Sequence, residues 1–215
     1  TDPTMSLKDN RREYDYGTLS RDSLHNNPFT QFSLWMDQAI EADIIDPTAM
    51  SVATVGQSGK PWQRMVLLKG FDERGFVFYT NLGSRKATDI AVNPHVSLQF
   101  PWLQLDRQVI VGGRAEALSA TEVRDYFNSR PLSSQLAAWA SEQSSPIASR
   151  AVLEAQFEAI KQQFSLGEVP LPEFGSGFRV VPKEFEFWQG GENRLHDRFY
   201  FQRQQDDWNI SRLSP

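Results

Sequence analysis

The sequence predicts an α+β domain built on an antiparallel β-barrel. Segments with the two-residue alternation of strands follow one another in runs, and segments with helical spacing are gathered between those runs. The strict strand–helix alternation of a parallel sheet does not occur in the sequence. Gly112 and Gly113 lie inside one strand segment, where they indicate the bulge or sharp bend that a barrel requires.

Composition narrows the class of protein. In 215 residues, 40% hydrophobic and 23% charged side chains are ordinary globular usage and allow a full core. The longest apolar run, Leu136–Ala140, is far shorter than the ~18 residues of a membrane span, and no signal peptide is recognisable. The chain has no cysteine, which excludes disulfides, thiolate metal sites and cysteine nucleophiles, and we expect a cytoplasmic protein. A net charge of −5 argues against a general nucleic-acid binder.

The N-terminal region differs from the rest of the chain. Because Thr1–Thr4 precede Met5, we expect them to be a remnant of expression. Residues 5–26 are polar. We therefore predict a mobile arm over residues 1–26 and a single domain over residues 27–215.

Capping signals mark the helices. Asn27 suits an N-cap and Pro28 the first helical position. Ser84 can cap a short helix, and Ser119 with Glu122 forms a capping box. The predicted helices cover residues 28–46, 85–92, 120–128, 133–141 and 145–166, the last opening at Ser145-Pro146 and ending before Gly167.

Apolar alternation marks the strands. They are predicted over Met50–Val55, Trp62–Phe71, Phe76–Thr80, Val96–Phe100, Arg107–Leu118, Phe178–Val181, Glu184–Trp188, Arg194–Arg203 and Trp208–Leu213. Gln204–Asp207 is predicted as the turn of the final hairpin.

Motifs typical of other enzyme classes are incomplete or absent in this sequence. Residues 56–60 (GQSGK) lack the glycine spacing of a phosphate loop, and residues 175–177 (GSG) lack the third glycine of a dinucleotide fingerprint. His25, His95 and His196 have no metal-ligand spacing, and no G-x-S-x-G elbow is present. Rossmann, metalloenzyme and hydrolase functions are therefore disfavoured.

Basic and hydroxyl side chains gather where strands end and a helix begins. Arg64 and Lys69 stand at the two ends of one strand segment, and residues 79–86 (YTNLGSRK) run from a strand into a helix N-terminus, which favours anions. Arg85 and Lys86 in the first helical turn oppose the helix dipole. A bound anion would remove that conflict, and a solvated helix start is the alternative interpretation.

A second basic group lies downstream of Trp188. Considered alone, Trp188 is typical of a core residue. Arg194, His196 and Arg198 alternate along a predicted strand and would share one face. Three potential cations on one face repel one another unless an acceptor lies among them. An exposed strand is the alternative interpretation.

Seven short strings in register resemble the pyridoxine/pyridoxamine 5′-phosphate oxidase family. They are RMVLLK (64–69), FYTNLGSRK (78–86), RQV (107–109), YFNSRP (126–131), QSS (143–145), EFWQG (186–190) and RLHDR (194–198). The similarity covers residues 11–215 and includes RREY at residues 11–14. Each string alone is weak, and their shared order carries the resemblance.

The resemblance implies a homodimer of FMN-binding split β-barrels with two flavins at the subunit interface. It implies oxidation of pyridoxine 5′-phosphate or pyridoxamine 5′-phosphate to pyridoxal 5′-phosphate, in vitamin B6 metabolism. O2 would be reduced to H2O2, and the amine substrate would release ammonia. It implies no metal, nucleic-acid or membrane partner.

The resemblance also implies site residues. FMN contacts fall on Arg64, Met65, Val66, Leu67, Leu68, Lys69, Tyr79, Thr80, Arg85, Lys86, Gln108, Gln143, Ser144, Trp188 and Arg198. The substrate phosphate falls on Lys69, Tyr126, Arg130 and Ser134. Arg194 and His196 would lie against the substrate ring as the catalytic pair, with Arg11 and Tyr14 closing over it. Arg198 is the candidate cation for the N1–C2=O edge of the flavin.

Two other functions stay open at this point. One is a related flavin enzyme with another substrate, such as the phenazine-pathway oxidases that share this barrel. These would lack the substrate-phosphate set, so Tyr126, Arg130 and Ser134 count against them. The other is a non-catalytic flavin- or pyridoxal-phosphate-binding carrier or sensor, against which Arg194 and His196 count.

Overall fold

The structure, a computed structural model, describes residues 7–215 and divides them into two compact units. Unit 1 comprises residues 7–49, 99–111 and 183–215, and unit 2 comprises residues 50–98 and 112–182. The segment Thr1–Thr4 and the first two residues of the polar stretch 5–26 lie outside the described residues. The division into an arm over residues 1–26 and one domain over 27–215 stays a prediction.

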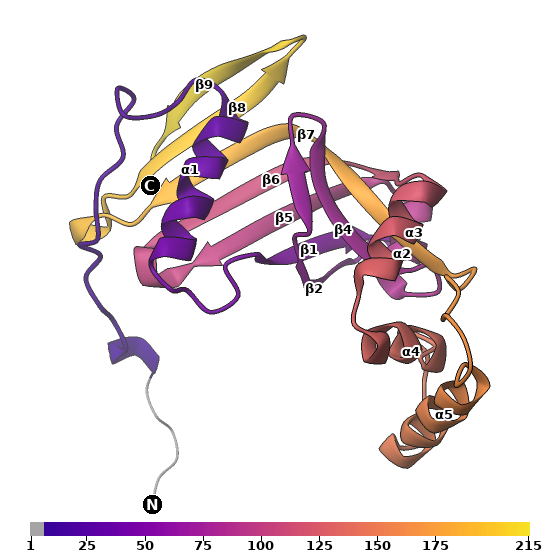
Figure 1. The fold of residues 1–215 in the computed structure, drawn as a ribbon. Coiled ribbons are helices and arrows are strands. Elements are labelled where there is room, and N and C mark those ends of the chain that lie inside the picture. Colours follow the sequence, from indigo (N-terminus) through magenta and orange to yellow (C-terminus); the bar gives the residue numbers. More distant parts are fainter. Residues whose placement is uncertain (1–6) are drawn as a thin grey trace, which may run out of the picture. The chain divides into compact units, whose positions relative to one another are not determined.

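Antiparallel strands form the frame of unit 2 (Figure 1). The strands that contribute to it are β1 (Ala49–Val55), β2 (Pro61–Leu67), β3 (Gly70–Asp72), β4 (Gly75–Asn81), β5 (His95–Trp102), β6 (Arg107–Ala117) and β7 (Gly175–Gln189). Their order is β2-β1-β5-β6-β7-β4-β3. On the edge strand β2, the side chains of Met65 and Leu67 are exposed.

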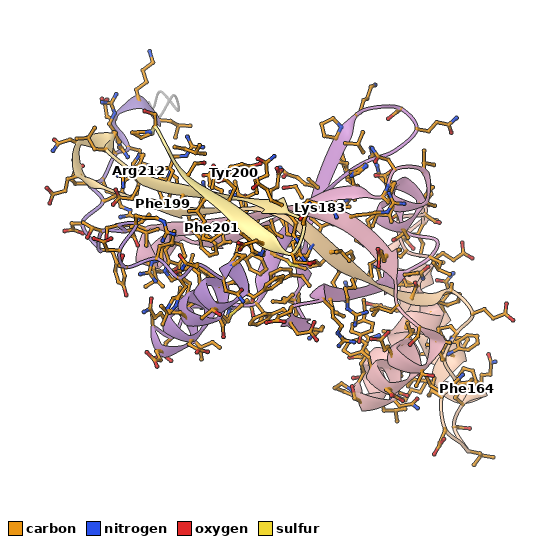
Figure 2. The ribbon with its side chains drawn as sticks, turned by 90° about the horizontal axis from the view of Figure 1, so that it is seen from above. Phe164, Lys183, Phe199, Tyr200, Phe201 and Arg212 are labelled. Carbon is orange, nitrogen blue, oxygen red and sulfur yellow. The ribbon has the colours of Figure 1, made fainter. Side chains whose placement is uncertain are left out.

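Helices complete unit 2. They are α2 (Arg85–Val92), α3 (Ala120–Ser129), α4 (Leu132–Ala140) and α5 (Arg150–Gln163). The helix pair α4 and α5, which Figure 1 shows next to each other, packs around buried Phe127, Leu136 and Val169. Phe164, labelled in Figure 2, is partly buried against this cluster.

Unit 1 packs one helix against strands that carry aromatic side chains. Its elements are η1 (Leu7–Asp9), α1 (Pro28–Glu41), η2 (Leu103–Leu105), η3 (Glu192–Arg194), β8 (Asp197–Gln204) and β9 (Asp207–Leu213), with parts of β5, β6 and β7. Asn27 caps α1, as predicted, and its side chain accepts a hydrogen bond from the Phe29 amide. The α1 side chain Trp35 lies edge-on to Phe187 with ring centroids 5.4 Å apart. Such aromatic pairs supply much of the apolar burial in a core.

Strand β8 of the β8–β9 hairpin buries alternate side chains near its middle. Figure 2 labels Phe199, Tyr200 and Phe201 along β8. Phe199 and Phe201 are buried, whereas the Tyr200 hydroxyl donates to Glu184 at 2.6 Å and that contact raises the pKa of Tyr200 to about 12. The final hairpin turn is confirmed, because Gln204 pairs with Asp207.

Several element boundaries differ from the sequence prediction. The first helix ends at Glu41 instead of near Asp46, because Asp43 adopts a left-handed φ of 53° that no helix tolerates. The last helix starts at Arg150 instead of Ser145, and Ser149 caps it through the Val152 amide. Residues 62–71 form two strands, since the chain leaves the ladder at Leu68 and Lys69.

The predicted break between two strands at residues 182–183 is wrong. Residues 175–189 form the single strand β7. Gly113 of β6 passes very close to β7, because a Cβ on Gly113 would lie 2.3 Å from the Val181 carbonyl oxygen. Glycine at this position, where a bulge or bend is predicted, therefore allows β6 to approach β7 closely.

Candidate functional site

Three cations form what we call the cation cluster: Arg85 and Lys86 in the first turn of α2, and Arg64 on β2. Ser84 caps the helix as predicted, accepting from the Ala87 amide at 3.3 Å. Lys86 is only 8% exposed, and its Nζ donates to Thr80 Oγ1 and Gln143 Oε1, both at 3.2 Å. Burial, followed by the charge of Arg64, lowers the pKa of Lys86. The ammonium is therefore held between neutral acceptors.

Arg64 uses only part of its guanidinium. Its Nη1 donates to Thr54 Oγ1 at 2.7 Å and to the Val52 carbonyl at 3.2 Å. Its Nη2 is buried without a hydrogen-bond partner, 3.9 Å from Asp89 Oδ2. Burial lowers the pKa of Arg64, the charge of Arg85 lowers it further, and Asp89 opposes both. A buried donor without an acceptor is costly, and an incoming anion would satisfy it.

Arg85 completes the cation cluster. Its guanidinium carbon lies 4.2 Å from the centroid of the Trp62 ring, and its backbone amide donates to Ser144 Oγ at 3.1 Å. Among residues 7–215, no carboxylate lies within 4 Å of the cationic groups of Arg85 or Lys86. The cluster thus carries an excess of positive charge at a helix N-terminus, which suits a phosphate dianion.

A cavity of about 310 Å³ lies next to these residues in unit 2. Tyr79, Thr80, Tyr126, Arg130 and Gln143 are among the residues that line it. The rings of Tyr79 and Tyr126 stack with centroids 3.7 Å apart and 9° between their planes. Burial raises the pKa of Tyr79, so its hydroxyl stays a hydrogen-bond donor near neutral pH. Aromatic walls with a guanidinium and hydroxyl groups suit a phosphorylated aromatic ligand.

Unit 1 holds a second group of predicted residues, Tyr14, Trp188, Arg194 and His196, which we call the ring cluster. The His196 ring lies 4.6 Å from Trp188 and 5.6 Å from Tyr14, measured between centroids. The Arg194 guanidinium carbon lies 4.9 Å from the centroid of the Tyr14 ring. The backbone amide of Gly191 donates to His196 Nδ1 at 3.1 Å, which leaves the proton of the neutral imidazole on Nε2.

The titration of His196 follows from these neighbours. Burial lowers its pKa below the usual 6.5, and the positive charges of Arg194 and Arg198 lower it further. The imidazole is therefore neutral near pH 7.

The predicted shared strand face of Arg194, His196 and Arg198 is wrong. Arg194 lies in η3 with a left-handed φ of 63°, and β8 begins only at Asp197. Arg198 is on β8 and forms two hydrogen bonds to the Glu186 carboxylate, at 2.7 and 3.2 Å. Glu186 thus pairs with Arg198, whereas Arg194 and His196 both contact the Tyr14 ring.

The remaining predicted residues are more scattered. Lys69 and Ser134 do not line the cavity, and Leu68 is buried. Gln108 accepts a hydrogen bond from Gln99 at 2.8 Å. Arg11 is exposed and donates to the Lys8 carbonyl at 2.9 Å, away from Tyr14.

Two residues of this region were missed by sequence reasoning. Arg12, not Arg11, lies over the Tyr14 ring, with 4.6 Å from its guanidinium carbon to the ring centroid. The spacing carried a signal, because residues 12 and 14 share a side in an extended segment. Asp106, the ion-pair partner of Arg12, lies far away in sequence and had no local signal.

Two features are not found in the described residues. No helix within residues 7–215 combines the length and apolarity needed to cross a membrane. No group of three or more histidine, cysteine, aspartate or glutamate side chains in that range is arranged to hold a metal ion.

Solved structures define the class of this fold. PhzG from Burkholderia lata 383, in complex with tetrahydrophenazine-1-carboxylic acid, matches with a TM-score of 0.86 and 27% identity over 92% of this chain and 98% of that one. A pyridoxamine 5′-phosphate oxidase-related, FMN-binding protein of Nostoc punctiforme PCC 73102 shares the fold, with a TM-score of 0.70 and 14% identity over 89% of this chain and 100% of that one. The chain is therefore a split barrel of the pyridoxamine 5′-phosphate oxidase type, and the predicted fold class is confirmed.

Sequence relatives identify the family. Residues 36–164 match the family model of pyridoxamine 5′-phosphate oxidase, and residues 176–215 match that of the pyridoxine 5′-phosphate oxidase C-terminal dimerisation region. The pyridoxine/pyridoxamine 5′-phosphate oxidase of Serratia proteamaculans (strain 568) is 59% identical over 98% of this chain and 97% of its own length. That of Pectobacterium atrosepticum (strain SCRI 1043) is 58% identical over 97% of this chain and 92% of its own length. The chain belongs to the pyridoxine/pyridoxamine 5′-phosphate oxidase family.

Proposed function

We propose that this chain oxidises pyridoxine 5′-phosphate or pyridoxamine 5′-phosphate to pyridoxal 5′-phosphate, with FMN as its cofactor. The substrate loses two electrons and two protons at its 4′ carbon, and O2 takes up both to form H2O2. With pyridoxamine 5′-phosphate, water then releases ammonia from the oxidised amine. The relatives named as this oxidase share 58–59% of their residues with the chain, which supports the same activity here.

The observation that carries the proposal is the unbalanced charge of the cation cluster. Arg64 has a buried Nη2 without a hydrogen-bond partner, and Arg85 and Lys86 have no carboxylate within ion-pair distance among the described residues. These donors, with the hydroxyls of Thr80 and Ser144 nearby, fit the phosphate of FMN. When bound, FMN supplies the two-electron redox chemistry that no side chain of this protein offers.

We assign the remaining predicted residues to the two ligands. The FMN ring would lie along the side chains Met65–Lys69 of the β2 segment, with Gln108, Trp188 and Arg198 contributing. Lys69, Tyr126, Arg130 and Ser134 would hold the substrate phosphate. Two separate anion sites agree with a reaction in which cofactor and substrate each carry a phosphate.

The ring cluster would orient the substrate. Neutral His196 offers Nε2–H as a donor, and Arg194 offers a charged donor next to Tyr14. Tyr14 would cover the substrate ring and exclude water. Orientation by the His196 and Arg194 donors can contribute several kcal/mol to lowering a barrier.

We also infer a homodimer in which each flavin site is shared between subunits. The match of residues 176–215 to a dimerisation region supports this assembly. The exposed apolar side chains Met65 and Leu67 on the edge strand β2 are suited to burial at such an interface.

Flavin release and anaerobic reduction test the proposal. The purified protein should be yellow, and acid precipitation should release all of its flavin as FMN. Pyridoxine 5′-phosphate added without oxygen should bleach the bound flavin. A colourless protein that FMN cannot reconstitute, or flavin that stays oxidised with both B6 substrates, would contradict the proposal.

Similarity to PhzG gives a second candidate, oxidation of a phenazine precursor. Tetrahydrophenazine-1-carboxylic acid has no phosphate, so Arg130→Ala should not affect its turnover. The same substitution should raise KM for pyridoxine 5′-phosphate while FMN stays bound. Reduction by the phenazine precursor alone would favour the second candidate.

A further inference from the structure

Asp106 is a buried carboxylate that connects the N-terminal segment to the end of β7. Its relative exposure is 3%, and it follows η2 with a left-handed φ of 52°. The carboxylate forms an ion pair with Arg12, and its Oδ2 accepts from the Tyr16 backbone amide at 3.3 Å. Arg12 Nη2 also donates to the Leu103 carbonyl at 3.1 Å. The two residues that flank Tyr14 on alternate positions are therefore both held by Asp106.

The backbone carbonyl of Asp106 binds the end of β7. Its carbonyl accepts from the Gly190 amide at 2.6 Å and from Gln189 Nε2 at 3.3 Å. These two residues directly follow Trp188 of the ring cluster. One residue thus bonds to the segment that carries Tyr14 and to the strand end that carries Trp188.

Tyr14 is seated between these two attachments. A Cβ on Gly190 would lie 2.9 Å from Tyr14 Cγ and 3.1 Å from Asp106 Cβ, so only glycine leaves room for the ring. The seated ring contacts Trp188 at 5.9 Å and His196 at 5.6 Å between centroids. Next to it, Glu13 Oε1 accepts from the Asn193 amide at 2.7 Å.

We propose that Asp106 is a positioning residue. Through Arg12 and the Tyr16 amide it fixes Tyr14 against Trp188 and His196, and so sets the affinity for the phosphorylated pyridine substrate. This inference rests on the proposed function, because Tyr14 is expected to cover the substrate. FMN retention should not depend on the Asp106 carboxylate, since its partners Arg12 and Tyr16 are not among the residues assigned to FMN. Because a fixed Tyr14 would contact the substrate before and during reaction alike, its loss should appear in KM and leave kcat nearly unchanged.

Asp106→Asn is the first test. Asparagine tolerates the left-handed backbone and can still accept from Tyr16, but it removes the ion pair with Arg12. We expect trypsin to cleave the holoprotein after Arg11 and Arg12 roughly ten-fold faster, and KM for pyridoxine 5′-phosphate to rise roughly ten-fold, as for one lost charge-assisted contact. Asp15→Asn is the matched control, because it removes an exposed carboxylate from the same segment and should change neither value.

Two further variants separate positioning from a general loss of structure. Asp106→Glu keeps the charge and should restore most of the lost affinity. Gly190→Ala crowds Tyr14 directly and should raise KM while FMN content and kcat stay unchanged. Equal cleavage rates and equal KM values in Asp106→Asn and the wild-type protein would overturn the inference, as would a loss of kcat without a change in KM.

The cleavage assay also distinguishes this inference from the proposed function. It needs no turnover, so faster cleavage of Asp106→Asn shows the anchoring even if the wild-type protein fails to oxidise pyridoxine 5′-phosphate. That failure would overturn the proposed function and the substrate role of Asp106 together. Unchanged cleavage with normal oxidation by the wild-type protein would overturn only the anchoring.

Discussion

Arg64, which is half-buried, and Lys86, which is buried, are hydrogen-bonded to different extents. Lys86 is satisfied by the neutral oxygens of Thr80 and Gln143, so its charge is stabilised by hydrogen bonds without a counter-ion. Arg64 donates through Nη1 to Thr54, and its Nη2 has no hydrogen-bond partner. Burying an unsatisfied charged donor costs stability, which a bound phosphate would recover.

Arg85→Ala tests the cation cluster. The substitution removes one charge near the proposed FMN phosphate, so FMN affinity should fall by roughly ten-fold or more, as for the loss of one charge-assisted hydrogen bond. Activity should recover at excess FMN through mass action. Fluorescence titration of the apoprotein with FMN measures the effect. Arg150→Ala, which removes an exposed arginine of α5, is the control and should bind FMN normally. Equal FMN affinity in both variants would count against the cluster.

Arg194→Ala tests the ring cluster. Losing a charged hydrogen bond to the substrate costs about 1.5–3 kcal/mol, so kcat/KM for pyridoxine 5′-phosphate should drop about ten- to a hundred-fold. The flavin should stay bound, which its absorbance after gel filtration would report. A variant that loses flavin, but has normal turnover per bound flavin, would show that Arg194 belongs to the cofactor site.

The pKa of His196 should respond to the same substitution. Arg194 is the second cause, after burial, of its lowered pKa, so Arg194→Ala should raise that pKa toward 6.5. Below pH 6.5 the unfolded chain binds more protons at this residue than the folded chain, so its contribution opposes folding as pH falls. An NMR titration of the His196 ring measures the shift. An unchanged midpoint would mean that Arg194 is too mobile to act on the imidazole.

At the scale of elements, capping decides where helices start. The capping box of α3 is confirmed, with the Ser119 amide donating to Glu122 Oε2 at 3.0 Å and the Glu122 amide donating to Ser119 Oγ at 3.2 Å. Arg179 of β7 adds a hydrogen bond from Nη2 to Glu122 Oε1 at 2.7 Å. The same carboxylate therefore caps the helix and attaches it to a strand.

Glu122 should make the stabilisation of α3 depend on pH in the acidic range. The Arg179 hydrogen bond first, and the Ser119 contacts next, lower its pKa from 4.5 to about 2. Its stabilising effect is therefore present above about pH 4.5 and is lost as the pH falls to about 2. The difference in unfolding free energy between the wild-type protein and Glu122→Gln should shrink across that range in denaturant titrations. Glu158→Gln on α5 is the control, and a difference for Glu122→Gln that does not vary with pH would contradict the prediction.

At the scale of the whole molecule, assembly and flavin binding should be linked. Residues 176–215 match a dimerisation region, and the proposed flavin sites are shared between subunits. A ligand that binds only the dimer stabilises it by mass action, so removing FMN should promote dissociation. Sedimentation velocity at falling protein concentration, recorded at the flavin absorbance, should show flavin only in the dimer. An active monomer that retains flavin would contradict this linkage.

Local signals in the sequence determined where three helices start, the final hairpin and the fold class. Asn27, Ser84 and Ser119 each begin a helix where predicted, because a cap depends on atoms two or three residues away. The final hairpin and the α+β class were equally predictable, since alternation and turn chemistry act over a few residues. The ordered strings that resemble one family gave the membership that the comparisons confirmed.

Only the tertiary structure decided how the distant residues meet. No local pattern indicated that β7 would continue through Pro182, or that Arg194 would lie in a left-handed turn before β8. Likewise, Asp106 pairs with Arg12 across most of the first half of the chain. Such contacts depend on which surfaces the folded chain brings together, and burial then makes them strong by excluding water. A sequence pattern that extends over a few residues contains no information about which surfaces meet or which contacts are buried.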